Sequence, residues 1–135
     1  MSEHHVIHLP TFVQVSNKTR FSINLNQYRN THFQVLNKAK ERFETQITDQ
    51  VQALPFFKQL AITYTLYPRT RQLCDVSNIC AIADKFFCDT LKNLGKISDD
   101  NYTVVLGTQY LFGEIDPHNP RVEARLHPHS QETPS

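Results

Sequence analysis

The spacing of apolar residues along the chain predicts two long helices. From about Phe33 to about Leu54, apolar residues recur at steps of three and four, and Pro55 ends the segment. The residues that carry this pattern are Val35, Leu36, Ala39, Phe43, Ile47 and Val51. A second helix is predicted from about Asn78 to about Leu94, with Gly95 at its C-terminal cap. Each helix therefore has one face to bury.

Four shorter segments have the composition and alternation of β-strands. Val6–Leu9 is one candidate, and Leu60–Tyr67, rich in β-branched and aromatic residues, is another. Thr103–Leu111 and Arg121–Leu126 follow, with a loop rich in Pro, Gly, Asn and Asp between them, so we expect the last strand to pair back on the previous one. The polar segment from Thr11 to Asn26 predicts no clear element beyond turns.

The predicted order is strand, loop, helix, strand, helix, strand, strand. This order favours an α/β (α+β) two-layer domain, with a small mixed β-sheet and helices packed on one face. A chain of 135 residues has room for one such core. We expect a single domain over residues 1–135, with its core in about 6–126 and a frayed tail in 127–135.

Composition agrees with an ordinary globular protein, with 39% apolar and 20% charged residues. No apolar run approaches the ~20 residues that span a bilayer, and no signal peptide is visible, so we expect a soluble, cytoplasmic protein without a membrane partner. Three cysteines, Cys74, Cys80 and Cys88, suggest free thiols, and core packing is the favoured role of the last two. None of the seven histidines has the spacing of a zinc site.

The charge distribution is more informative than the net charge of +1. From Lys18 to Glu44 there are six basic residues against two acids, and Arg69 and Arg71 add a second basic segment. Asp75 to Asp100 carries five acids against three lysines. This arrangement suits a protein that binds phosphates with one part and a divalent cation with another. The alternative is an ordinary solvated surface of mixed charge.

The second predicted helix and the turn after it hold the candidate chemistry. Asn78, Lys85, Asp89 and Lys92 fall within about 60° of one another on a helical wheel, away from the apolar side. If the turn at Asp99–Asp100 returned to the start of the helix, Asp75, Asp89 and one of this pair would converge. Converging carboxylates favour Mg²⁺ or Mn²⁺, which can activate water beside a phosphate. The alternative is an exposed helix face with an i,i+4 ion pair between Lys85 and Asp89.

These runs resemble one known family. Residues 75–78 (Asp-Val-Ser-Asn), 84–91 (Asp-Lys-Phe-Phe-Cys-Asp-Thr-Leu) and 95–100 (Gly-Lys-Ile-Ser-Asp-Asp) are similar, in this order, to the motifs of the RusA family of Holliday junction resolvases. The resemblance extends over roughly Val6 to Leu126. It implies a small homodimeric endonuclease, of phage or prophage origin, that uses a divalent metal to cut four-way DNA junctions.

The resemblance also implies roles for individual residues. Asp75 matches the first motif aspartate, Lys85 the catalytic lysine and Asp100 the acidic ligand after the helix, so these three are the expected catalytic residues. The expected metal ligands are Asp75, Asp89, Asp99 and Asp100, with Mg²⁺ as cofactor and Mn²⁺ as a substitute. The expected DNA-binding residues are Arg29, Asn30, His32, Lys38, Arg69, Arg71, Asn78 and Lys85.

The sequence departs from the family pattern at two points. Ser77 stands where the motif has a second aspartate, and about four extra residues separate Asn78 from Lys85, roughly one helical turn. Asp84 could replace the lost carboxylate, but on a straight helix it points about 100° away from Lys85, towards the buried side. We therefore expect a metal-dependent endonuclease that acts on Holliday junctions or other branched DNA. The alternative is a RusA-like DNA-binding module that cuts weakly or not at all.

Overall fold

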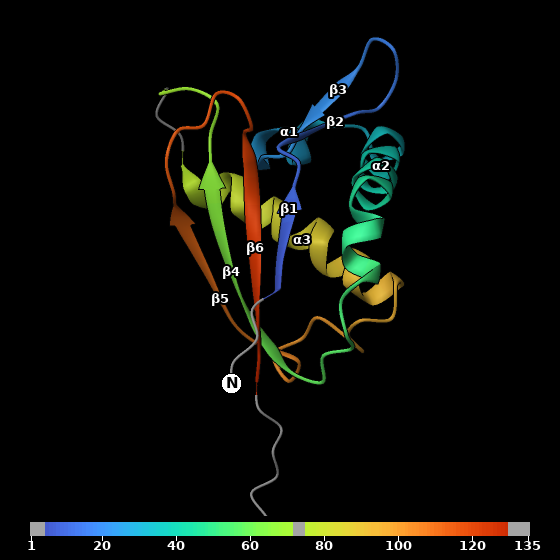
Figure 1. Ribbon diagram of the computed structural model, residues 1–135. Helices are drawn as coiled ribbons and strands as arrows, with labels where there is room; N and C mark the ends of the chain where they lie inside the picture. Colours follow the sequence, from blue (N-terminus) through green and yellow to red (C-terminus); the bar gives the residue numbers. More distant parts are fainter. Residues whose placement is uncertain (1–4, 72–74, 130–135) are drawn as a thin grey trace, which may run out of the picture.

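The computed structural model describes residues 5–71 and 75–129, and in this range the chain forms six strands and three helices. The strands are β1 (His5–Leu9), β2 (Phe12–Gln14), β3 (Arg20–Ser22), β4 (Leu60–Tyr67), β5 (Val105–Phe112) and β6 (Arg121–Pro128). The helices are α1 (Leu25–Asn30), α2 (Phe33–Gln52) and α3 (Val76–Asn93). The expected class is confirmed: a mixed sheet with helices on one side, as Figure 1 shows.

The main sheet has the strand order β1-β6-β4-β5. β6 is antiparallel to both β1 and β4, whereas β5 is parallel to β4. The expectation that the last two strands form a hairpin is therefore wrong. β6 is inserted between β1 and β4, where both of its edges are hydrogen-bonded and Val122, Ala124 and Leu126 are buried. The strand also extends through His127 and Pro128, which the sequence had suggested belonged to a frayed tail.

The core lies between the sheet and the helices. Leu60, Ile62, Tyr64 and Leu66 alternate with partly exposed residues along β4, so every second side chain faces the helical layer. α2 contributes Ala39, Phe43, Ile47 and Val51, four of the residues that predicted it. On α3, Phe86 contacts the rings of Phe21, Tyr28 and Phe43, which joins the three helices and the small sheet.

The segment without a clear sequence pattern contains a β-hairpin and a short helix. β2 and β3 form a two-stranded antiparallel sheet, and the buried Val13, Val15, Phe21 and Ile23 anchor it to the core. Asn24 caps α1 by accepting a hydrogen bond from the Gln27 amide at 2.8 Å. Strands of three residues are too short to show a clear alternation, which is why the sequence did not reveal them.

α3 is the element that positions most of the candidate site. Asp75 caps its first turn, and Gly95 follows its end with a φ of 74°, a left-handed conformation that glycine adopts readily. Cys80 and Cys88 are buried on this helix, as expected, and Cys74 lies outside the described residues. Because the helix is continuous over 18 residues, it separates the residues at its two ends.

Candidate functional site

Asp75 lies at the N-terminus of α3, in an exposed position. Its Oδ1 accepts a hydrogen bond from the Ser77 amide at 3.0 Å and another from the Ser77 hydroxyl at 2.8 Å. The carboxylate is thus oriented at the positive end of the helix dipole. Ser77, the residue at the position of the missing aspartate, supplies a hydrogen-bond donor to Asp75 instead of a second negative charge.

A second carboxylate group lies at the C-terminal end of the same helix. Lys92 Nζ is 3.8 Å from Asp89 Oδ1 and 3.6 Å from Asp100 Oδ1. All three side chains are about one third to two fifths exposed. Asp89 therefore forms its ion pair with Lys92, three residues away, and the turn after the helix brings Asp100 to the same lysine.

Asp99 is held by the turn itself. Its Oδ1 accepts a hydrogen bond from the Asp100 amide at 2.7 Å, and its Oδ2 accepts one from Asn101 Nδ2 at 2.9 Å. The bond from the Asp100 amide is the main reason that the pKa of Asp99 is lowered. Asp99 is therefore a fixed, ionised carboxylate at neutral pH, close in the chain to Asp100.

The expected convergence of Asp75 with Asp89 and Asp100 is not formed within one chain. Asp75 and Asp89 are fourteen residues apart on a helical path, which corresponds to about 21 Å at 1.5 Å per residue. The turn at 99–100 stays at the far end of α3. Among the residues that the structure describes, no three His, Cys, Asp or Glu side chains are placed to hold a metal ion together. Within the described residues, the expected carboxylates are therefore not gathered into one group.

The carboxylate of Asp84 faces the sheet and accepts hydrogen bonds from it. Its Oδ1 accepts hydrogen bonds from the Tyr64 hydroxyl at 2.5 Å and from Cys88 Sγ at 3.3 Å, and its Oδ2 accepts one from the Tyr110 hydroxyl at 3.5 Å. The pKa of Tyr64 is raised well above its usual value, chiefly by burial, and burial also raises the pKa of Tyr110, to about 12. Asp84 thus joins α3 to β4 and β5, and it does not replace the carboxylate absent at Ser77.

Lys85 is exposed near the middle of α3, where α1 packs against the helix. Its Nζ lies 5.8 Å from the centre of the Tyr28 ring, a cation–π distance. Arg29 and Asn30 follow Tyr28 at the exposed end of α1. The structure therefore groups three of the expected DNA-binding residues around the contact between α1 and α3.

The other expected DNA-binding residues are also exposed. His32 caps α2, its Nδ1 accepting a hydrogen bond from the Gln34 amide at 3.1 Å, and its ring stacks on the exposed ring of Phe33. Lys38 lies on the outer side of α2, and Asn78 lies on the first turn of α3. Arg69 and Arg71 lie in the segment after β4.

A cleft between α2 and α3 was not anticipated from the sequence. Its volume is about 530 Å³, and Glu41, Glu44, Asp89 and Lys92 are among the residues that line it. Asn93 Nδ2 donates a 2.8 Å hydrogen bond to Glu44 Oε1 across the cleft. The available signal was the pair Glu41 and Glu44, one helical turn apart on the predicted polar side of α2.

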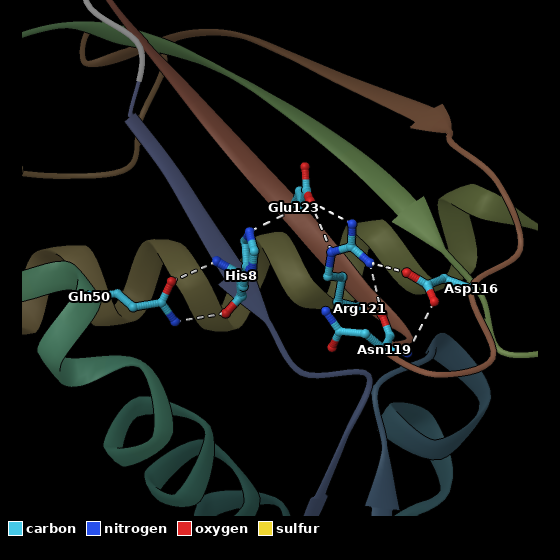
Figure 2. A network of polar contacts seen from close by, with 6 residues as sticks. All are labelled: His8, Gln50, Asp116, Asn119, Arg121 and Glu123. Atoms are coloured by element: carbon cyan, nitrogen blue, oxygen red, sulfur yellow. Dashed lines mark hydrogen bonds and ion pairs between the residues drawn. The ribbon is translucent and has the colours of Figure 1, made fainter.

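A polar network around Arg121 was also missed (Figure 2). Its guanidinium group contacts Asp116 and Glu123, each at 2.8 Å, and lies 4.1 Å from the ring centre of Tyr67. The hydrogen bond from Arg121 is the main reason that the pKa of Asp116 is lowered. This network ties the loop before β6 to the sheet, so its role is structural.

No protein-family model matches the chain, and no curated protein shows a significant match to it. The resemblance to the RusA family therefore depends on the residues themselves. In the part of the chain that the structure describes, no helix has both the length and the apolar character needed to cross a membrane.

Proposed function

We propose that this protein is a homodimeric, metal-dependent DNA endonuclease that resolves Holliday junctions or other branched DNA. One observation carries this proposal. Asp75 caps α3, Asn78, Lys85 and Asp89 follow in motif order along its polar side, and Asp99 and Asp100 lie in the turn after the helix. The exposed Arg29 on α1, and Arg69 and Arg71 after β4, accompany this row of residues.

The chemistry assigned to the residues follows from their charges and positions. Carboxylate oxygens are the ligands that Mg²⁺ and Mn²⁺ prefer, and a bound cation of this kind can activate a water for phosphodiester hydrolysis. Lys85 is exposed and can contact the scissile phosphate or the leaving oxygen. The neighbouring arginines bind phosphates without reading base sequence, which suits recognition of a junction by its shape.

Because Asp75 and Asp89 lie near opposite ends of α3, the proposed mechanism requires a dimer. A single copy keeps Asp75 about 21 Å from Asp89, so it does not hold the expected ligands together. A twofold axis that reverses the direction of α3 brings Asp75 of one copy towards Asp100 of the partner subunit. In our proposal each active site is therefore completed by the second copy, and two sites face two strands of one junction.

The test is cleavage of a synthetic four-way junction with Mg²⁺ or Mn²⁺. We expect the wild type to cut, and Asp75→Asn and Asp100→Asn each to lose cutting while keeping junction binding in a gel shift. A mixture of the two variants tests sharing of the site between copies. Heterodimers then contain one site with both aspartates intact, so partial cutting returns. Absence of metal-dependent cutting by the wild type would refute the nuclease proposal.

A second candidate function is a DNA-binding module that cuts weakly or not at all. The observation that favours it is the hydroxyl of Ser77, which donates to Asp75 where the family motif has a further carboxylate. Gel-shift binding of the junction without cutting would support this candidate. Ser77→Asp adds the missing charge, and an increase in metal-dependent cutting would show that the site lacks only this ligand.

A further inference from the structure

β5 has an open edge. It is the last strand in the order β1-β6-β4-β5, and within the described residues the sheet pairs it with β4 only. At the opposite edge of the sheet, β1 is protected: the side chain of Gln50 accepts a hydrogen bond from the His8 amide at 2.8 Å and donates one to the His8 carbonyl at 3.0 Å (Figure 2). Within the described residues, the β1 edge therefore has a side chain hydrogen-bonded to its backbone, whereas the β5 edge is open.

The sequence of β5 lacks the residues that normally protect an edge strand. Residues 101–113 contain no charged residue and no proline, the features that usually prevent pairing with another chain. Instead, large apolar side chains are exposed on this strand: Leu106 is 44% exposed, Leu111 41% and Phe112 55%. An open backbone edge flanked by exposed apolar side chains is a surface for adding a further strand.

We propose that β5 pairs in antiparallel fashion with β5 of a second copy of this chain, joining the two sheets into one of eight strands. An antiparallel pair of identical strands satisfies twofold symmetry, since each residue then meets its partner in a reciprocal way. When the axis passes through Gln109, Gly107 lies opposite Leu111 of the partner subunit, because both are two residues from the centre within the regular part of β5. The uncharged strand has no feature that selects a charged peptide instead.

This interface also brings the expected metal ligands of two copies towards each other. Only this consequence of the interface rests on the proposed function. β4 and β5 are parallel, α3 begins after β4, and Asp99 and Asp100 precede β5. Asp75 and the Asp99–Asp100 pair are therefore at opposite ends of the β4–β5 pair. Figure 1 shows β4 and β5 running in the same direction. An antiparallel copy exchanges these ends, so Asp75 lies towards Asp100 of the partner subunit, as the proposed function requires.

The experiment places like charges at the centre of the proposed interface. In Gln109→Lys and in Gln109→Glu, identical charges face each other across the axis, and we expect the dimer dissociation constant to rise by roughly tenfold or more. An equimolar mixture pairs Lys with Glu and is expected to restore the dimer. Sedimentation equilibrium measures these states against a protomer mass of 15.7 kDa. Gln46→Lys, on the exposed side of α2, is the matched control and is expected to remain dimeric.

The outcomes separate this interface from the proposed function. A monomeric wild type, a dimer that persists in both Gln109 variants, or a mixture that fails to restore the dimer would each overturn the interface. If the Gln109 variants remained dimeric and still cut junctions, the nuclease proposal would stand without this interface. If the charge pair restored the dimer and the wild type did not cut, the interface would stand and the nuclease proposal would fall.

Discussion

The hydroxyl of Tyr64, at the centre of β4, donates a 2.5 Å hydrogen bond to the carboxylate of Asp84 on α3. Tyr64 is fully buried, so this contact satisfies a polar group that would otherwise be costly inside the core. It also determines how α3 is rotated against the sheet. With Asp84 directed towards β4, the stripe that carries Asn78 and Lys85 faces solvent.

Asp84→Ala is expected to destabilise the fold. The substitution leaves the buried Tyr64 hydroxyl without its acceptor, which costs roughly 2 kcal/mol of the free energy of unfolding. Urea denaturation followed by circular dichroism measures this loss. Asp89→Ala, on the same helix but partly exposed, is the control and should change the free energy of unfolding by less than about 0.5 kcal/mol. Equal effects of the two substitutions would argue against a structural role for Asp84.

Stability is expected to fall in alkaline solution. Burial raises the pKa of Cys88 and of Tyr64 in the folded state, so folding favours their protonated forms. Their contribution is complete below the pKa values of the unfolded chain, about 8.5 for cysteine and about 10 for tyrosine, and it is lost as the pH rises above them. Between pH 7 and pH 10 we expect a loss of roughly 1–2 kcal/mol in urea denaturation. Cys88→Ala should reduce this pH dependence, and an unchanged profile in that variant would contradict the assignment.

Phe86→Ala is expected to be among the most damaging core substitutions. Phe86 is buried and contacts aromatic rings from β3, α1 and α2, so its removal opens a cavity where these elements meet. The expected loss is about 3–5 kcal/mol of the free energy of unfolding. Phe56→Ala removes an equally large ring that is 60% exposed, and it should cost far less. Thermal denaturation of both variants checks the difference.

Lys85→Ala is expected to separate catalysis from folding. If Lys85 contacts the scissile phosphate, its loss should lower metal-dependent junction cutting by roughly a hundredfold. The melting temperature should stay unchanged, because the side chain is exposed and its cation–π contact with Tyr28 is weak. Lys18→Ala, an exposed lysine between β2 and β3, controls for the general loss of a positive charge. A similar decrease in both variants would indicate non-specific electrostatics and not a role in the reaction.

Several features of the candidate site were predictable because they depend on local spacing. We expected Asn78 and Lys85 to lie on the side of α3 that faces away from the core. The structure confirms this, because both residues are exposed. Asp84 was expected to point towards the buried side, and it does. These features follow from the 100° step between successive residues of a helix, which the sequence alone defines.

The sequence by itself determined the two long helices α2 and α3, the four strands of the main sheet and the polar stripe of α3, since each depends on contacts or periodicities within a few residues. Tertiary structure decided that β6 lies between β1 and β4 and not beside β5, because the choice of strand partner depends on residues more than fifty positions apart. It also decided that Asp75 and Asp100 lie far from each other. Whether the chain after α3 folds back along the helix or stays at its end depends on where β5 begins, and that is set by its pairing with β4.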